Sequence, residues 1–554
     1  MISLRNQAAT PALDASCPAP AEHLQRAMVV VVLVSASLAL LVTAPASGNF
    51  SWSDAPRHAL NGAFVKDLIA AFPWHDPRSW AIGYYMRYPA LTIVFYPPLF
   101  YFVEAVVFAI VGVTNWAAQV TVTLFTLLLA FAAYGFARFA LPRWSSVAVA
   151  LLAIGAPEVA YWGRQVMLDI PAYATLVTSV YFFVRYLEQN HRRDIYLTAL
   201  FVLAAIYTKL GSAFIAPVLA ATFVVARGRN ALRDRDAIWA ALLAAVGVIP
   251  ALLMTLHFGA VNVESVAGRS IDLPRASLGA WIFYARQMPR YLGPVGAMLA
   301  CVGFVLLVLR RIGPTQRWFA LLLIAWLGFG YLFYSTIDVR LPRHGLAMVL
   351  PLVVCAVLVL HRVLPDRIAQ AAAMVLGLGT LGYSLAFDSP PVINGYDQVT
   401  DYVAQHAPKD AVIVFAGYRD GNFIFDLRTH EERRDIATLR ADKLLLSIAV
   451  ERVRGVEQKT YDEAAIAQML RDYGVSLVVA QPGFWTDLEE MRRFEAVLHT
   501  PNFTRVAQFD ITGTEPHDDN SIEIYQPTYP VTQSRNGLQL DMPIIGRKFQ
   551  GQIQ

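Results

Sequence analysis

Two aspartates stand out because acidic residues are rare in the first 387 residues, which contain only 16 of them. Asp54 and Asp169 each border an apolar stretch, whereas most of the other acids fall in polar tails and loops where water solvates a charge. A carboxylate beside an apolar surface can accept a proton from a hydroxyl nucleophile. Each could instead simply be an acid at the start of a helix, where the N-cap position and the helix dipole favour it. As a pair, Asp54 and Asp169 predict a catalytic site for base chemistry.

Polar side chains follow Asp54 at helical spacing. Pro56 favours a helix start, and Arg57 and His58 lie three and four residues after Asp54, on the same expected helix face. We therefore expect Arg57 and His58 to contact the substrate. The opposite face, which begins with Ala59, is expected to lie on the membrane surface.

Several cations at the ends of apolar runs are candidates for anion binding. Lys209 separates two apolar runs, and Arg340 and Arg343 share a very short loop. Ammonium and guanidinium groups bind phosphate well, so these three residues are candidate substrate-binding residues, together with Arg164 in the loop before Asp169. The alternatives are a lysine that only snorkels to the membrane surface and an arginine pair that binds a lipid head group.

The elements that must position these residues are membrane helices. The apolar run 28–44 is interpreted as an uncleaved signal anchor, and eleven further apolar runs lie between residues 97 and 387. Loops rich in arginine are expected on the cytoplasmic side. Alternation from them gives eleven crossings, with one run between 97 and 160 not spanning, the N-terminus inside and the C-terminus outside. The basic loops are 191–193, 227–235, 310–317 and 362–367.

Charge divides the chain at residue 388. Residues 1–387 hold 44 charged side chains with a net charge of +12, whereas the much shorter segment 388–554 holds 42 with a net charge of −8. We expect a disordered cytoplasmic tail at 1–26, a transmembrane catalytic domain at 27–387 whose first outer loop is 46–96, and an extracytoplasmic soluble α/β domain at 388–554. An acidic soluble domain argues against a nucleic-acid partner.

The soluble part shows both strand and helix patterns, and its turns contain no glycine-rich phosphate-binding motif. The three cysteines of the chain have no spacing typical of disulfide frameworks or zinc sites. The expected strands are 411–417, 475–481, 504–511 and 522–525, and the expected helices are 396–406, 441–454, 461–473 and 486–498.

Five stretches, in this order along the chain, resemble the C-type (GT-C) membrane glycosyltransferases. They are an outer loop with Asp54 at the start of a juxtamembrane helix, Tyr-Pro-Pro-Leu-Phe-Tyr from Tyr96, Arg-Gln-Val-Met-Leu-Asp-Ile-Pro from Arg164, Thr-Lys-Leu-Gly around Lys209, and Arg-Leu-Pro-Arg from Arg340. The branch that looks most similar contains protein O-mannosyltransferases, the lipid A aminoarabinose transferase and bacterial core galacturonosyltransferases. The expected fold class is therefore a GT-C-like polytopic helical membrane protein, with about 11 to 13 membrane helices, followed by the soluble α/β domain.

The resemblance implies an inverting glycosyltransferase in the cytoplasmic (inner) membrane. It would move a sugar from a polyprenyl-phosphate carrier to a lipid, glycan or protein acceptor on the outer face. By the same resemblance, Asp54 is the catalytic base or orients the acceptor, Asp169 assists it, and Lys209, Arg340 and Arg343 hold the carrier phosphate. Which sugar and which acceptor are used stays open.

Two features bear on the substrate and on a cofactor. Tyr96 stands where the aminoarabinose transferase has a lysine, and its ring is a candidate to stack on a sugar. Some relatives bind a divalent metal, and a divalent metal is possible here, with His75, Asp76 and His257 as conceivable ligands. Their spacing is not diagnostic of a metal site, so no residue is assigned to a metal.

Two other classes of function compete with the enzyme. A polytopic transporter or lipid flippase predicts ionisable residues at mid-membrane and inverted repeats, whereas this chain places its unusual acids at the outer surface and shows no repeat. A structural or assembly protein would work through its soluble domain, in which no catalytic motif is recognisable.

Overall fold

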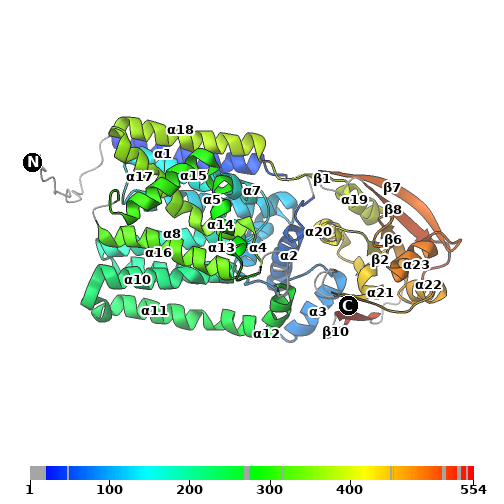
Figure 1. Cartoon of the computed structure of the whole chain (residues 1–554). Helices are drawn as coiled ribbons and strands as arrows, with labels where there is room; N and C mark the ends of the chain where they lie inside the picture. The colour runs from blue at the N-terminus through cyan, green and yellow to red at the C-terminus, as the bar shows by residue number, and fades with distance from the viewer. Residues whose placement is uncertain are drawn as a thin grey trace, which may run out of the picture.

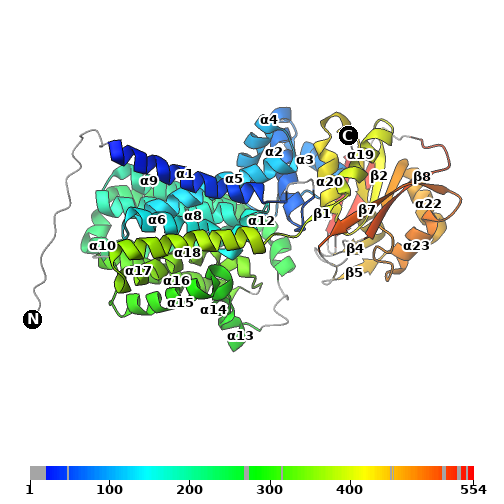
Figure 2. The same cartoon turned by 90° about the horizontal axis from the view of Figure 1, so that it is seen from above.

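The computed structural model describes residues 20–45, 49–266, 274–313, 316–337, 339–448, 452, 455–514, 520–532, 538–544 and 547–553. A long helix bundle and a smaller α/β part lie end to end, with α2 (Ala55–Ala71) and α3 (Pro77–Arg87) between them (Figure 1, Figure 2). Helix α1 begins at Pro20, within the stretch predicted as a tail, and residues 1–19 of that stretch lie outside the described residues.

Most helices of the bundle are long and apolar, because a helix of about 20 apolar residues matches the thickness of a membrane. They run in sequence order from α1 to α18, and the chain then enters the α/β part. The long helices are α1 (Pro20–Val42), α5 (Asn115–Ala137), α8 (Asp169–Gln189), α10 (Ile215–Arg227) with its adjoining 3-10 turns, α11 (Arg235–Gly247), α12 (Ile249–Val266), α15 (Met288–Val308), α16 (Arg317–Thr336), α17 (Val349–Val363) and α18 (Asp366–Phe387).

The number of possible membrane spans is smaller than expected. Within the described residues, nine helical segments are long and apolar enough to cross a membrane, or ten if the bent pair α6 (Arg143–Gly155) and α7 (Pro157–Gly163) is one span. A polytopic helical membrane protein is confirmed, but 11 to 13 membrane helices were predicted. The difference arises where an apolar run forms a short or broken helix: α4 (Leu99–Val111) has 13 residues, and α6 and α7 meet at 62° beside Pro157. Helix α9 (Arg192–Thr208) has 17 residues.

Helix α2 differs from the surface helix that its sequence suggested. Ala59 and Ala63 are fully buried and Phe64 is nearly so, because α2 packs against α4 on one side and against the α/β part on the other. The packing against α4 is close: a Cβ on Gly62 would overlap the side chain of Glu104. The expectation that this face lies on the membrane surface is therefore wrong.

The α/β part is built on a six-stranded sheet of order β1-β7-β8-β6-β2-β3, in which β6, β2 and β3 are parallel and the remaining pairings are antiparallel. The parallel strands β2 and β6 are runs of apolar residues because helices cover both faces of such strands. A second sheet has the order β10-β9-β4-β5. The strands are β1 (Ile393–Asn394), β2 (Val412–Ala416), β3 (Ala437–Arg440), β4 (Leu446–Ile448), β5 (Val456–Gln458), β6 (Val475–Ala480), β7 (Phe503–Gly513), β8 (Asn520–Pro527), β9 (Leu538–Ile544) and β10 (Arg547–Ile553).

The four predicted strands of this part are confirmed as β2, β6, β7 and β8, and three of its four predicted helices are confirmed. These helices are α19 (Tyr396–His406), α22 (Glu463–Asp472) and α23 (Glu489–Leu498). The helix predicted over 441–454 is wrong: α21 (Ala441–Leu445) stops after five residues, and the chain continues as β4 because β5 offers it a pairing partner. Helix α20 (Asp420–Thr429), which no prediction included, docks the α/β part onto α2.

Candidate active site

Four charged residues that are far apart in the sequence form one continuous row, here called the charge row: Asp54, Arg343, Asp169 and Lys209. Arg343 lies between the two acids, with Nη2 3.9 Å from Oδ2 of Asp54 and Nη1 3.8 Å from Oδ2 of Asp169. Nζ of Lys209 donates to Oδ1 of Asp169 at 2.6 Å. The row therefore contains two acids and two cations in alternation.

Breaks between helices place these four side chains. Asp54 precedes α2 and Asp169 opens α8, which continues through Pro171. Lys209 has an extended backbone between α9 and the 3-10 helix η1 (Leu210–Phe214), and Arg343 is the second residue of the 3-10 helix η4 (Pro342–Met348). Helix α2, which follows Asp54, lies at the end of the bundle that faces the α/β part (Figure 1). The charge row therefore lies at that end.

The two acids of the row differ in their surroundings. The side chain of Asp169 is 3% exposed and is engaged by Lys209, whereas the side chain of Asp54 is 33% exposed. Asp54 occupies the N-cap position of α2, but its side chain makes no capping hydrogen bond. The simple capping interpretation therefore does not account for Asp54, and its carboxylate is the accessible one.

Arg343 is held mainly by aromatic rings that pack on the faces of its guanidinium. Its guanidinium lies 5.2 Å from the ring centroid of Trp52 and 5.1 Å from that of Trp162, and the two indoles meet edge to face. The side chain is 13% exposed, and its buried Nε and Nη1 atoms have no hydrogen-bond partner among the described residues. Stacked aromatic faces hold an arginine in place but leave its donors unused. The donors of Arg343 are thus positioned for an oxyanion.

The inner part of the charge row borders a pocket with about 290 Å³ of empty space, which includes open solvent. Asp169, Lys209 and Arg343 line one part of it, and Tyr173 and Tyr334 contribute aromatic wall. Convergent charged groups in a pocket are typical of ligand sites. The pocket lies between the charge row and the first two turns of α8.

His58 and Tyr96 form a second group beside Asp54. Nδ1 of His58 lies 2.9 Å from the hydroxyl of Tyr101, and its ring meets the ring of Tyr96 edge to face at 5.0 Å. Burial lowers the pKa of His58 to about 4, so its imidazole is neutral at pH 7. Burial likewise raises the pKa of Tyr96, which keeps its hydroxyl protonated. Both side chains offer neutral polar groups near Asp54.

The other three predicted substrate-binding residues have different surroundings. Arg57 makes a bidentate ion pair with Asp420 at 3.1 and 3.0 Å. Arg164 is fully buried and donates to the backbone oxygens of Ala160, Ser384 and Asp388, so it fixes the end of α18. Nη2 of Arg340 donates to the backbone oxygen of Ser335 at 3.0 Å, at the end of α16. The structure thus gives each of these arginines a partner within the protein.

The sequence did not predict the contacts between the α/β part and the segment around Asp54. These contacts are here called the α2–α20 junction. Asp420 pairs with Arg57 on one side and with Arg440, at 2.6 Å, on the other. Arg440 and Arg57 outweigh the effect of burial and hold the pKa of Asp420 at about 2. Asn422 exchanges two hydrogen bonds with the backbone of Phe50, at 3.0 and 2.9 Å. The junction therefore holds the chain in place on both sides of Asp54.

A second ion pair closes the junction further along α2. Arg428 is fully buried and donates to Asp67 from Nη2 at 2.9 and 2.7 Å and from Nε at 3.1 Å, while Arg434 approaches the same carboxylate at 2.9 Å. Asp67 also accepts from the hydroxyl of Tyr84. The signal available in the sequence was the high density of charge in 419–435, which was interpreted only as typical of a soluble domain.

The three residues considered as metal ligands, His75, Asp76 and His257, have other surroundings. Oδ1 of Asp76 caps α3 by accepting from the backbone N–H of Ser79 at 3.0 Å, and the ring of His75 packs on Trp74. His257 is exposed in the middle of α12. In the part of the chain that the structure describes, no three His, Cys, Asp or Glu side chains are grouped to hold a metal ion.

Comparison with known proteins supports the class that this fold and site define. Residues 96–254 match the family described as dolichyl-phosphate-mannose-protein mannosyltransferase. The structure is similar to that of ArnT from Cupriavidus metallidurans bound to undecaprenyl phosphate, with a TM-score of 0.65 and 14% identity over 92% of this chain and 99% of that one. It is also similar to the oligosaccharyltransferase of Archaeoglobus fulgidus, with a TM-score of 0.54 and 12% identity over 90% of this chain and 75% of that one. No curated protein matches the sequence.

These findings confirm the resemblance to the GT-C class. The chain has an ArnT-like fold that includes the α/β part, since the similarity to ArnT covers nearly the whole of both chains. The family match begins at Tyr96 and spans Asp169 and Lys209, two residues of the charge row.

Proposed function

We propose that the protein is an inverting glycosyltransferase that moves a sugar from a polyprenyl-phosphate carrier to a lipid, glycan or protein acceptor. The observation that carries this proposal is Arg343, a buried guanidinium with unused donors, placed between two carboxylates. The similar ArnT structure contains undecaprenyl phosphate, a lipid anion of the kind that such a cation would bind.

The exposed acid of the charge row suits the role of general base. Asp54 takes the proton of an acceptor hydroxyl as that oxygen attacks the anomeric carbon of the sugar. The bond from the anomeric carbon to the carrier phosphate breaks as the new glycosidic bond forms on the opposite face, so the configuration inverts. Asp169 is less suited to this role because it is buried and bound to Lys209.

The cations of the row suit the departing phosphate. Lys209 and Arg343 point toward the shared pocket, and fixed positive charge at the place where negative charge develops lowers the barrier. Proton uptake by Asp54 also removes one of the two negative charges that flank Arg343. The positive charge of Arg343 thus becomes available as the phosphate acquires its own negative charge. Asp169 positions both cations.

The position of the charge row supports a reaction on the outer membrane face. Helix α8 begins at Asp169 and its 21 residues span about 30 Å before the basic segment 191–193. Helix α18 likewise runs from the basic segment 362–367 to the α/β part. Because arginine-rich loops remain in the cytoplasm, the charge row and the α/β part belong on the opposite side.

A flippase or transporter is the alternative function. It would need its charged groups near mid-membrane, in helices that are broken there. The charge row instead lies at helix ends, where an acceptor and the head group of a lipid donor can meet. This location favours the transferase.

The proposal is tested by measuring binding of undecaprenyl phosphate to the purified full-length protein in detergent by native mass spectrometry. We expect Arg343→Met to weaken binding at least tenfold, and Arg343→Lys to weaken it as well, because lysine lacks the planar fork of donors. Arg311→Met, which removes an exposed arginine at the far end of α15, is the matched control. Binding to Arg343→Met as tight as to the unchanged protein would contradict the proposal.

A further inference from the structure

A second pocket lies in the α/β part, where the connections of its sheet change direction. The chain leaves β2 through α20 to reach β3 on one side, and it later enters β6 on the other side of β2. In open α/β sheets, the crevice at the carboxyl ends of two such strands is where ligands bind. A pocket lies at this position, with about 310 Å³ of empty space that includes open solvent, and it is bordered by Ala416 and Ala480, the last residues of β2 and β6.

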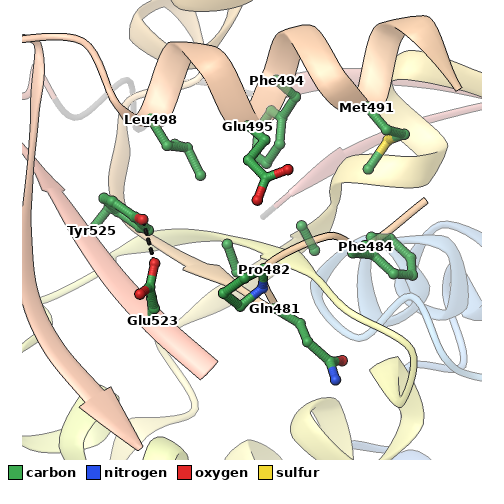
Figure 3. Close-up of a pocket in the computed structure, with 11 residues that line it drawn as sticks. Gln481, Pro482, Phe484, Met491, Phe494, Glu495, Leu498, Glu523 and Tyr525 are labelled. Carbon is green, nitrogen blue, oxygen red and sulfur yellow. Dashed lines mark hydrogen bonds between the residues drawn. The ribbon is translucent and has the colours of Figure 1, made fainter. Parts of the chain in front are cut away.

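The wall of this β2–β6 pocket combines aromatic rings with fixed acceptors (Figure 3). Glu495 points from α23 into the space above Pro482, and its Oε1 accepts from the backbone N–H of Gly483 at 3.0 Å. Glu523 on β8 accepts from the hydroxyl of Tyr525 at 2.5 Å and pairs with Arg505. These contacts hold both carboxylates in fixed orientations.

Apolar side chains and one amide complete the wall. Phe484, Phe494 and Met491 supply the apolar surface. Oε1 of Gln481 accepts from the backbone N–H of Tyr418 at 3.1 Å, which fixes the orientation of the amide. Aromatic side chains beside carboxylate and amide groups match a sugar, which has both an apolar face and a rim of hydroxyl donors.

The charge of the pocket selects among ligands. No lysine or arginine lines it, and no glycine-rich loop adjoins it, so phosphates and nucleotides are excluded. Arg505 neutralises Glu523, whereas Glu495 leaves the pocket with a net negative charge. An acidic sugar would be repelled, and a neutral or cationic sugar would be accepted.

The loop that follows β2 connects the pocket to the segment around Asp54. Asp420 lies four positions after Ala416, a span of at most about 14 Å, and it pairs with Arg57 of α2. Within that stretch the ring of Tyr418 contacts Phe484 of the pocket at 5.0 Å, and Arg419 donates to the backbone oxygen of Ser51 at 2.7 Å. The pocket thus adjoins the loop that carries Asp54.

We propose that the β2–β6 pocket is a carbohydrate-binding subsite for a neutral or amino sugar of the acceptor, an inference that rests on the proposed glycosyl transfer for its acceptor role. The aromatic wall packs on the apolar face of the sugar, and Glu495 accepts from its hydroxyl or ammonium donors. The subsite holds the acceptor beside the first loop, while the lipid donor occupies the bundle.

Saturation-transfer difference NMR on the full chain in detergent tests the subsite with three soluble probes: N-acetylglucosamine, glucosamine and glucuronic acid. We expect the first two to bind and glucuronic acid not to bind. Glu495→Gln should weaken glucosamine binding about tenfold, because it removes the negative charge and keeps the shape. Glu489→Gln, on the same helix but outside the pocket, should bind glucosamine as the unchanged protein does.

The outcome separates this inference from the proposed function when undecaprenyl phosphate binding is measured on the same samples. Absence of binding by both expected sugars, equal binding of glucuronic acid, or unchanged glucosamine binding by Glu495→Gln would overturn the subsite. If undecaprenyl phosphate still binds in those samples, the transferase proposal stands. If the sugars bind as expected and undecaprenyl phosphate does not, the subsite stands as a carbohydrate site and the proposed donor is wrong.

Discussion

Replacement of Asp420 by asparagine is expected to loosen the α2–α20 junction. Asp420 is 7% exposed and lies between Arg57 and Arg440, with distances of 3.0 to 3.1 Å to Arg57 and 2.6 Å to Arg440. Asparagine has nearly the same shape but carries no charge, so two arginines would lose their shared anion. The residue acts on the reaction indirectly, by fixing the helix that follows Asp54.

The magnitude follows from the pKa of Asp420. Burial alone raises this pKa, but Arg440 and Arg57 hold it at about 2, against an ordinary value of 3.8. The difference corresponds to about 2 kcal/mol. Because the folded-state pKa is lowered, this stabilisation is fully present above pH 3.8 and is lost as the pH falls through 2. At neutral pH the junction should therefore open about 30-fold more often in the Asp420→Asn variant.

Hydrogen exchange of the full chain in detergent at neutral pH measures this opening. We expect the amides of α20 and of the first turn of α2 to exchange about 30-fold faster in Asp420→Asn, while those of α8 and α17 stay unchanged. Asp472→Asn, which alters an aspartate in the exposed last turn of α22, is the matched control. Unchanged exchange at α2 and α20 would show that this ion bridge does not hold the junction.

Three further predictions concern the charge row, His58 beside it, and the orientation of the chain in the membrane. Lys209→Met should destabilise the protein by about 3–5 kcal/mol, since it leaves the buried Asp169 without its nearest cation, and adding Asp169→Asn should restore most of the loss in thermal unfolding. Because burial lowers the pKa of His58 to about 4, stability should fall by about 3 kcal/mol between pH 6.5 and 4, and His58→Asn should flatten that dependence; an unchanged profile would contradict it. Labelling of single cysteines at residue 230 and at residue 472 in intact cells should report opposite membrane sides, and labelling on one side would refute the orientation.

The sequence identified the residues of the charge row but not the distances between them. Rare acids and misplaced arginines select Asp54, Asp169 and Arg343, and alternation of apolar runs predicts that they share a membrane face. Contacts of 3.8 to 3.9 Å through one guanidinium depend on how helix ends pack, which no local pattern encodes. Trp52 and Trp162, which hold Arg343, were missed for the same reason.

Helix α2 shows why the surroundings of Arg57 and His58 could not be predicted from spacing alone. Spacing placed Arg57 and His58 on one face, with the opposite face expected on the membrane surface. In the structure α2 lies between α4 and α20, so His58 meets Tyr101 while Arg57 meets Asp420. A sequence gives no sign that a second domain covers the outer side of such a helix. The strands of that domain were predictable because their apolar runs are local.

In the proposed reaction, Asp54 accepts the proton of the acceptor hydroxyl. This role is tested by measuring sugar transfer from a polyprenyl-phosphate donor in proteoliposomes that contain the Asp54→Asn protein, with Asp76→Asn as the control. We expect a rate at least 100-fold below that of the unchanged protein, with undecaprenyl phosphate still bound and with Asp76→Asn fully active. Full transfer by Asp54→Asn would contradict it.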